Sequence, residues 1–328
     1  FELFVAMPEQ SLETVLEPSA PPPSCSYAQT LVFVVLLLLF WTTSFLVQAT
    51  CAVLTSVLLL CGGRERLHHI QSFTFRFWNS LALLLNPLWR LRVVSEVPGT
   101  PLVPASAGGP GTLLIVNHRS NLDPWVMARL LQKSCVEARF CYKASLGKIP
   151  IAGWCCVLAG DLPAHFGNKD RIGEMLERSR ALLSQGYNIV VFPEGTRSPS
   201  GVLQDFKPTF FNMAAELGCP VVPVCLFGTE RAWPAGGFKM GCANMTAFIG
   251  RTCAPVEPGA EGARMLMDEV VATYKRLAGS GVQDACVDAD DPMLTGQPYR
   301  WWRRPGHMEQ LSGDEVLALL KSGKGHER

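Results

Sequence analysis

A long apolar stretch without charges limits what this chain can fold into. No Asp, Glu, Lys or Arg occurs between Glu17 and Arg64, and residues 31–61 within that window read LVFVVLLLLFWTTSFLVQATCAVLTSVLLLC. As one helix, this run would extend for roughly 45 Å at 1.5 Å per residue, whereas the hydrocarbon core of a bilayer is about 30 Å thick. Residues 31–62 are therefore predicted to form a transmembrane or re-entrant segment, either one tilted span or a hairpin bent near Gln48. A buried core helix is the less favoured alternative, because core helices rarely carry such runs.

The sequence on either side of this run indicates its orientation. Residues 1–30 contain four Glu and no Lys or Arg, which argues against a secretory signal or transit peptide, and with the Pro run at 21–23 they are predicted to be a disordered lead-in. Arg64, Arg66 and Arg76 follow the run. By the positive-inside rule, the rest of the chain is predicted to lie on the cytosolic side.

The next stretch, Phe73 to Val93, mixes aromatic and basic side chains. Residues 70–93 are predicted to form an amphipathic helix at the membrane surface, broken near Asn86–Pro87. A helix packed against the following domain is an equally weighted alternative, and the two are compatible.

From Gly111 onward, short β-rich runs alternate with helical patterns, after a Pro/Gly-rich linker at 95–111. This alternation predicts an α/β fold, with a mainly parallel mixed sheet flanked by helices. Residues 95–255 are assigned to this domain and residues 256–328 to a C-terminal helical extension. Strands are predicted at Thr112–Val116, Ala138–Tyr142, Trp154–Ala159, Asn188–Phe192, Val221–Phe227 and Thr246–Ile249. Helices are predicted at Pro124–Lys133, Lys169–Gln185, Pro208–Leu217 and Gly262–Leu277.

Charge and cysteine usage exclude several classes of protein. The formal net charge is +1, so no nucleic-acid partner is expected. The 12 cysteines have no CxxC spacing, which favours buried free thiols in a reducing compartment. The six histidines are dispersed, so no metal site is predicted.

The stretch VNHRSNLDPW at residues 116–125 places a histidine after a predicted buried strand, with a carboxylate five residues later. Asp123 precedes Pro124, so it is predicted to cap the next helix, and His118 alone is as readily a structural histidine. If the turn folds Asp123 back onto His118, the carboxylate would fix the imidazole tautomer. The other ring nitrogen could then accept a proton from a substrate hydroxyl. Since no nucleophile elbow lies nearby, such a pair suits direct attack without a covalent intermediate.

A second polar turn, VVFPEGTRSPSG at residues 190–201, also follows a predicted strand. Gly195 and Thr196 can present main-chain N–H groups, and the planar guanidinium of Arg197 suits a phosphate. Glu194 would anchor that arginine or bind a hydroxyl. A surface turn with a local Glu–Arg pair is the alternative interpretation.

Together, NHxxxxD at 117–123 and FPEGTRS at 192–198 resemble the glycerolipid acyltransferase family, which includes the lysophosphatidate (1-acyl-sn-glycerol-3-phosphate) acyltransferases. The resemblance covers about residues 70–255. Further pieces that support it are KIPIAG at 148–153, LQDFKPTFFNMA at 203–214 and PVVPV at 220–224.

The resemblance implies that His118 is a general base oriented by Asp123. It implies that the second motif holds the glycerol phosphate of the acceptor, through Glu194, Gly195, Thr196 and Arg197. Pro223 would belong to a further element near the acyl donor, and Asn117 and Lys207 are secondary candidates. Many family members carry an Arg in a pattern like GxxFIxR between the motifs, but residues 160–171 read GDLPAHFGNKDR. The candidate substitutes for that arginine are His165, Lys169 and Arg171.

The implied reaction transfers a fatty acyl group from acyl-CoA to the free hydroxyl of lysophosphatidic acid, giving phosphatidic acid, without a cofactor. Acylation of glycerol-3-phosphate or another lysophospholipid is the close alternative, and a non-catalytic membrane lipid-binding protein is the alternative from a different class. The expected partners are acyl-CoA, a lysophospholipid and a membrane. The expected location is the endoplasmic reticulum membrane with the domain facing the cytosol, or the plastid envelope if a leader precedes Phe1.

Overall fold

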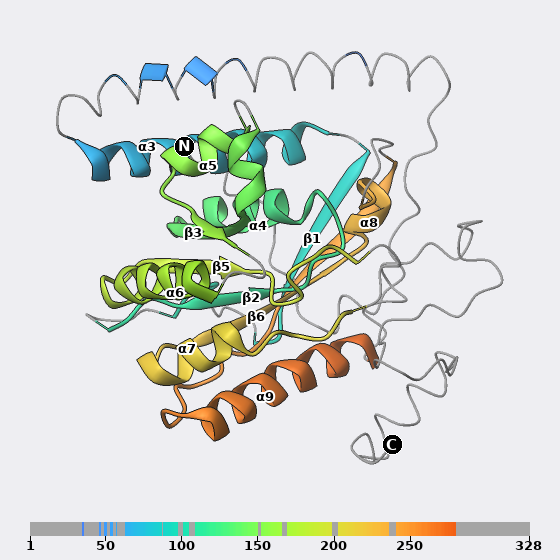
Figure 1. The fold of residues 1–328 in the computed structure, drawn as a ribbon. Helices are drawn as coiled ribbons and strands as arrows, with labels where there is room; N and C mark the ends of the chain where they lie inside the picture. Colours follow the sequence, from blue (N-terminus) through green and yellow to red (C-terminus); the bar gives the residue numbers. More distant parts are fainter. Residues whose placement is uncertain are drawn as a thin grey trace.

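The computed structural model describes residues 63–97 without Pro87, 101–104, 109–149, 152–165, 169–198, 203–235 and 241–279, and seven isolated helical positions between 35 and 57 (Figure 1). The predicted lead-in at 1–30 lies outside these residues. Apart from the seven positions, so does the predicted membrane segment at 31–62. Within the described part, no helix combines the length and the apolar character needed to cross a bilayer.

Seven strands form one sheet in the order β1-β7-β6-β2-β5-β3-β4. All neighbouring strands are parallel except β6 and β7, which are antiparallel. The predicted mainly parallel mixed sheet is therefore confirmed. The strands are β1 (Trp89–Ser95), β2 (Leu113–Val116), β3 (Ala138–Lys143), β4 (Leu162–Ala164), β5 (Asn188–Val191), β6 (Val221–Phe227) and β7 (Ala243–Ile249).

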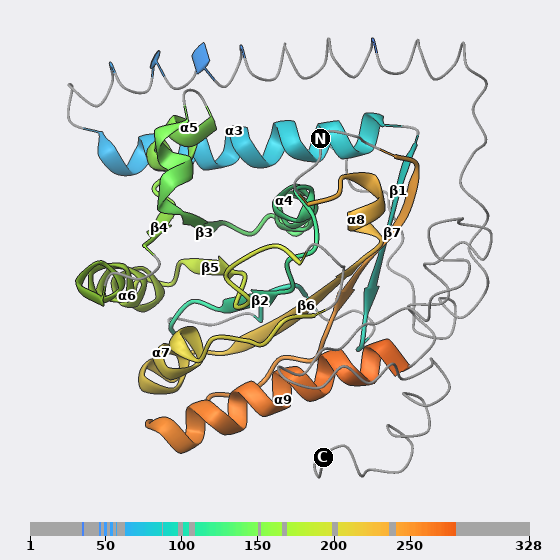
Figure 2. The same ribbon diagram turned by 45° about the vertical axis from the view of Figure 1, so that its right-hand side comes forward.

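Helices cover both faces of this sheet, as Figures 1 and 2 show. One face carries α3 (Arg64–Leu85) and α4 (Asp123–Lys133). The other face carries α6 (Lys169–Ser184), α7 (Thr209–Leu217) and α9 (Ala260–Gly279). Shorter elements complete the domain: the 3₁₀ turn η2 (Ala144–Lys148), α5 (Ala152–Leu158) and α8 (Thr229–Ala232).

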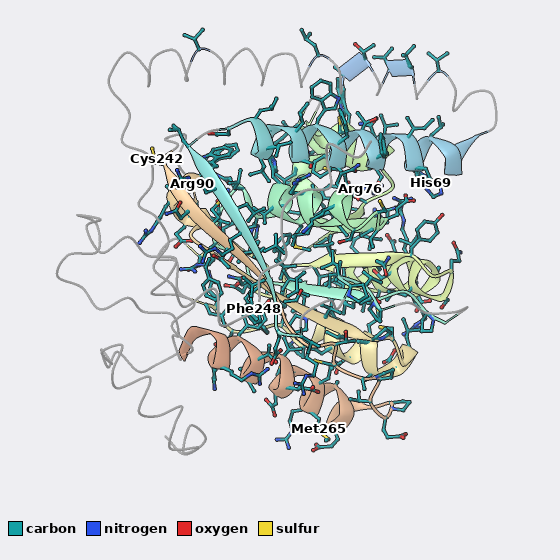
Figure 3. All side chains as sticks on the ribbon, turned by 180° about the vertical axis from the view of Figure 1, so that it is seen from behind. His69, Arg76, Arg90, Cys242, Phe248 and Met265 are labelled. Atoms are coloured by element: carbon teal, nitrogen blue, oxygen red, sulfur yellow. The ribbon has the colours of Figure 1, made fainter. Side chains whose placement is uncertain are left out.

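The central strand β2 shows why the sheet is buried on both faces. Leu113 and Ile115 join the apolar cluster under α6, α7 and α9, while Leu114 and Val116 join the cluster under α3 and α4. Successive side chains of a strand point to opposite faces, and all four are fully buried. A continuous apolar run is expected for such a strand. Figure 3 shows Phe248 of β7 in the interior of the molecule and Met265 of α9 on its outer surface.

Two predicted elements are wrong. The predicted strand at Trp154–Ala159 is helix α5, in which Trp154 and Val157 are exposed and Cys155 is buried. Short apolar runs do not distinguish a strand from a helix by their periodicity. Gly153 allows this helix to pack on η2, because a Cβ there would lie 2.1 Å from the main-chain oxygen of Leu146.

The helix predicted at 70–93 is found only for its first part, and its position at a membrane surface stays a prediction. Helix α3 ends at Leu85, next to the predicted break at Asn86–Pro87, but the chain then forms strand β1. Leu91 and Val93 bury their side chains in the core, and the strand pairs with β7 along its whole length. Tertiary pairing therefore overrides the helical pattern beyond Asn86.

The domain is larger than the predicted 95–255, because β1 and α9 belong to the same sheet and core. The buried Tyr274 of α9 places its hydroxyl 3.0 Å from the Ile115 carbonyl oxygen in β2 and 2.9 Å from that of Val224 in β6. Its single proton is shared between two neighbouring strands. The predicted extension therefore contributes to the core as far as Tyr274, α9 ends at Gly279, and residues 280–328 lie outside the described residues.

Replacing Tyr274 with Phe is expected to lower the free energy of unfolding by about 1–2 kcal/mol, because two buried carbonyl oxygens lose a shared donor. Urea denaturation of the purified protein measures this value. Tyr142→Phe is the matched control, since the hydroxyl of this half-buried residue on β3 makes none of the hydrogen bonds found among the described residues. Equal effects of the two changes would show that the Tyr274 hydroxyl does not help to anchor α9 to the sheet.

Candidate active site

Three loops meet at one edge of the sheet. Strand β2 pairs in parallel with both β5 and β6, so the carboxyl ends of these three strands lie side by side (Figure 2). Ligands of open parallel sheets bind at this edge. The loops that leave it carry the first motif after Val116, the second motif after Val191, and a third segment after Phe227.

His118 and Asp123 form a direct pair. The imidazole Nδ1 lies 2.9 Å from Asp123 Oδ2. The Asp123 side chain is fully buried, whereas 18% of the His118 side chain is exposed. A carboxylate can only accept from the ring, so it holds the tautomer that carries its proton on Nδ1. The ring nitrogen Nε2 is then the one that can meet a substrate.

The Asp123 carboxylate organises the whole loop. Its Oδ2 also accepts the main-chain N–H groups of Arg119 at 2.6 Å and Ser120 at 2.7 Å. Its Oδ1 accepts the hydroxyl of Thr229 at 2.7 Å. The buried negative charge therefore has four donors, which offset the cost of removing it from water.

The predicted role of Asp123 as a helix cap is wrong. Helix α4 starts at Asp123 itself, Leu122 is its N-cap residue, and no side chain makes a capping hydrogen bond there. The carboxylate instead turns back towards the preceding loop. The main-chain N–H of Leu122 donates to the hydroxyl oxygen of Ser120 at 2.9 Å.

The second motif encloses His118. The imidazole stacks on the ring of Phe192 with a centroid distance of 4.2 Å and an angle of 27°. The main-chain carbonyl of His118 accepts the N–H of Ser198 at 2.8 Å. The main-chain N–H of His118 donates to Glu194 Oε1 at 2.7 Å. The two motifs thus hold each other through both main-chain and side-chain contacts.

The buried carboxyl group of Glu194 links two loops. It does not form the local ion pair with Arg197 that the sequence allowed. Its Oε2 accepts the main-chain N–H of Gln204 at 2.9 Å, while Oε1 accepts that of His118. Burial raises the pKa of its carboxyl from the usual 4.5 to about 8, although the two N–H donors lower it and Asp123 raises it further. Its suggested contact with the acceptor stays a prediction.

The exposed end of the second motif carries the side chains suited to a phosphate. Gly195 has a φ of 73°, which turns the chain sharply. Thr196 and Arg197 are exposed, and the Thr196 hydroxyl donates to Gln204 Oε1 at 3.3 Å. The Arg197 guanidinium donates to Asn121 Oδ1 in the first motif. This contact therefore holds Arg197 beside the first motif, at the same edge of the sheet as His118.

The secondary candidates are scattered. Asn117 is buried and exchanges hydrogen bonds with the main chain of Leu226, at 2.9 and 2.7 Å, so it joins β2 to β6. Pro223 lies inside the sheet, in register with Ile115. Lys207 is exposed, and its main-chain N–H donates to Pro193.

The structure describes the side chains of two of the three substitutes for the family arginine, and the role of all three stays a prediction. Arg171 is exposed on α6 and pairs with Glu174 at 2.8 Å. His165 follows β4, the edge strand, which is three positions from β2. The side chain of Lys169 lies outside the described residues.

The sequence motifs do not include the third loop, which supplies Thr229 to the site. A sequence signal does exist: Gly228 and Thr229 follow a predicted strand, as the polar residues of the two motifs do. Gly228 has a φ of 77°, and a Cβ there would lie 2.2 Å from the main-chain oxygen of Asn244. A polar turn that requires Gly therefore follows a buried strand at this edge of the sheet, as the two motifs do.

Comparisons with known proteins show which sequences this chain is similar to. Residues 95–227 match the family model described as Acyltransferase. The chain is 31% identical over 180 residues to a chloroplastic 1-acyl-sn-glycerol-3-phosphate acyltransferase of Brassica napus, covering 55% of this chain and 48% of that protein. It is 33% identical over 150 residues to the human 1-acyl-sn-glycerol-3-phosphate acyltransferase alpha, covering 44% and 49%. These matches confirm the family resemblance that the two motifs indicate.

The chain spans about half the length of these curated relatives. Among solved structures, the 1-acyl-sn-glycerophosphate (LPA) acyltransferase PlsC from Thermotoga maritima has the same fold, with a TM-score of 0.58 and 22% identity. The similarity covers 80% of this chain and 99% of that one.

The buried Glu194 predicts how stability depends on pH. Its folded-state pKa of about 8 exceeds the usual 4.5, so the folded protein keeps a proton that the unfolded chain releases between these values. The contribution of this proton to the free energy of unfolding is fully present below about pH 4.5 and is lost as the pH rises through about 8. Over this pH window, the free energy of unfolding of the wild-type protein is expected to fall by about a few kcal/mol relative to that of Glu194→Gln.

Chemical denaturation of both proteins across this pH range measures the difference. Asp161, whose buried carboxyl has a pKa raised to about 7, contributes equally to both curves, so only their separation counts. The Glu194→Gln variant loses one acceptor at every pH, which adds a constant offset. Parallel curves for wild type and variant would contradict a proton on Glu194.

Proposed function

We propose that this chain, whose residues 95–227 belong to the acyltransferase family, transfers a fatty acyl group from acyl-CoA to the free hydroxyl of lysophosphatidic acid. The product is phosphatidic acid. The observation that carries the proposal is the His118–Asp123 pair, at 2.9 Å, on the sheet edge that also presents Arg197. The names of the relatives support this acceptor.

The chemistry follows from the position of the imidazole. As the acceptor hydroxyl attacks the thioester carbonyl carbon, His118 Nε2 removes its proton, and Asp123 stabilises the imidazolium that forms. A carbon–oxygen bond forms, the carbon–sulfur bond breaks, and His118 returns the proton to the departing thiolate of CoA. A positioned base of this kind contributes roughly 10²–10⁴-fold in rate.

The transfer proceeds directly between the two substrates. The one hydroxyl side chain in the first motif is that of Ser120, which donates to the main-chain oxygen of Trp233 at 2.6 Å and accepts from the N–H of Leu122. Both contacts hold this hydroxyl within the loop, so it does not serve as the nucleophile in the proposed mechanism. An acyl-enzyme is therefore not part of the proposed mechanism.

The acceptor is bound through its phosphate. Arg197 is exposed and presents a planar fork that suits two phosphate oxygens. Its contact with Asn121 sets its direction before the acceptor arrives. Glycerol-3-phosphate and larger lysophospholipids share this phosphate, and they are the alternative acceptors.

The substrates define where the protein works. Both carry acyl chains, so we propose a membrane location and retain the membrane segment predicted at residues 31–62. The domain would face the cytosol at the endoplasmic reticulum. The plastid envelope is the alternative location, supported by the word chloroplastic in the names of two relatives.

Substitution of His118 by Ala is expected to reduce acyl transfer by roughly 10²–10⁴-fold, because no other group replaces the base. The assay uses membranes that contain the full chain, with radiolabelled acyl-CoA and lysophosphatidic acid. The matched control is His69→Ala, which changes a histidine that pairs with Glu137 just before β3, at the opposite end of the strands. Full activity of His118→Ala would overturn the catalytic assignment of His118, whereas a wild-type chain that transfers no acyl group would favour a lipid-binding protein.

Substitution of Arg197 by Ala is expected to raise the KM for lysophosphatidic acid by roughly 10- to 100-fold, since a charged hydrogen-bond donor to the phosphate is lost. Arg197→Lys should recover only part of the affinity, because Lys cannot bind bidentately. Arg264→Ala, at an exposed arginine on α9, is the control. Steady-state kinetics with a panel of lyso-acceptors provides the readout, and dominant use of an acceptor without phosphate contradicts the role of Arg197.

A further inference from the structure

The turn between β6 and β7 lies directly against the first motif. This turn, Gly228–Pro234, is called the α8 segment here, and it starts just past residue 227, where the family match ends. The Thr229 hydroxyl donates to Asp123 Oδ1 at 2.7 Å, and both side chains are fully buried. The donor of this hydrogen bond, Thr229, lies outside both motifs.

Further contacts fix the α8 segment against the loop that carries His118. The main-chain oxygen of Trp233 accepts both the Ser120 hydroxyl, at 2.6 Å, and the Asn121 N–H, at 3.3 Å. The buried guanidinium of Arg119 lies 3.3 Å from Glu230 Oε1. The segment therefore contacts three consecutive residues that follow His118.

Contacts with β7 and within the α8 segment fix the main chain at Thr229. Gly228 lies so close to β7 that a Cβ would meet the Asn244 main-chain oxygen at 2.2 Å. The Thr229 carbonyl accepts the N–H of Trp233 at 3.0 Å, which closes the α8 turn. The main chain that carries the Thr229 hydroxyl is therefore fixed by its own contacts.

The division of donors between the two carboxylate oxygens gives this contact its importance. Oδ2 serves the His118 ring and two main-chain N–H groups, whereas Thr229 is the donor found for Oδ1 among the described residues. Without it, one oxygen of a buried carboxylate would have no donor, and the plane of the carboxylate would be free to turn. Either change weakens the hold of Asp123 on the imidazole.

We propose that Thr229 is a positioning residue for the His118–Asp123 pair. By fixing Oδ1, it keeps Oδ2 directed at Nδ1, so that Nε2 stays directed at the acceptor hydroxyl. The effect on catalysis rests on the proposed function, but the effect on the imidazole does not.

The test compares Thr229→Val, which keeps the shape and removes the hydroxyl, with Thr229→Ser, which restores it. Thr229→Val is expected to lower kcat by roughly 10- to 100-fold, with little change in the KM for lysophosphatidic acid, because the acceptor site is intact. Its solvent isotope effect should rise as proton removal becomes slower. Thr229→Ser should recover most of kcat.

The matched control is Thr273→Val on α9. Thr273 is also a buried threonine, and its hydroxyl donates to the Glu269 carbonyl at 3.1 Å, far from both motifs in the sequence. A general loss of folded protein would lower kcat without changing the isotope effect. An equal loss of kcat, with an equal rise in the isotope effect, in Thr273→Val would overturn the proposal.

A second readout needs no substrate. The ring proton that His118 donates to a buried carboxylate gives a low-field proton NMR signal in the full-length protein, and its absence in His118→Gln assigns it. This signal should shift or broaden in Thr229→Val and persist in Thr229→Ser and Thr273→Val. An unchanged signal in Thr229→Val overturns the positioning role. If the signal moves but the wild-type protein acylates no acceptor, the positioning role stands and the proposed function fails.

Discussion

The buried carboxylate of Asp123 is the interaction on which the site depends. A fully buried negative charge without partners costs several kcal/mol, so its donors must be fixed when the protein folds. Those donors come from the His118 ring, from two main-chain N–H groups beside it and from Thr229 across the sheet edge. The requirement to satisfy one carboxylate therefore sets the shape of the loop that presents the imidazole.

The sheet brings these donors together. Residues far apart in the chain become neighbours because β5, β2 and β6 are adjacent and parallel, so their loops leave at one edge. Asn117 strengthens this arrangement through its two hydrogen bonds to Leu226, and Tyr274 bridges the same two strands from the opposite helix layer. Glu194 then ties the second motif to the His118 main chain. A rigid frame of this kind suits acyl transfer, in which a base must stay within hydrogen-bond distance of a hydroxyl.

Much of this arrangement could be predicted from the sequence, and the exceptions have physical reasons. Strand β6 and helix α4 were predicted to within one residue, because a short continuous apolar run rich in Val and a Pro at a helix start are local signals. Strand β1 and helix α5 were not, since pairing with β7 and packing on η2 decide their conformation.

The site followed the same division between local and long-range signals. The pairing of His118 with Asp123 was anticipated, but the hydrogen bond of Asp123 to Thr229, more than 100 residues later in the chain, was not. Glu194 looked like the partner of a nearby arginine, and it is instead a buried tie to two main-chain N–H groups. Contacts between distant loops are invisible in a motif of seven residues.

The most direct test of this account is the kcat of Asp123→Asn, measured with acyl-CoA and lysophosphatidic acid on protein shown by circular dichroism to be folded. An amide keeps the size of the side chain, but it removes the charge that stabilises the imidazolium and one of the acceptor oxygens. The account predicts a loss of roughly 10²–10⁴-fold in kcat, with a much smaller change in the KM for the acceptor. A folded Asp123→Asn protein that retains kcat within a few-fold of wild type would contradict it.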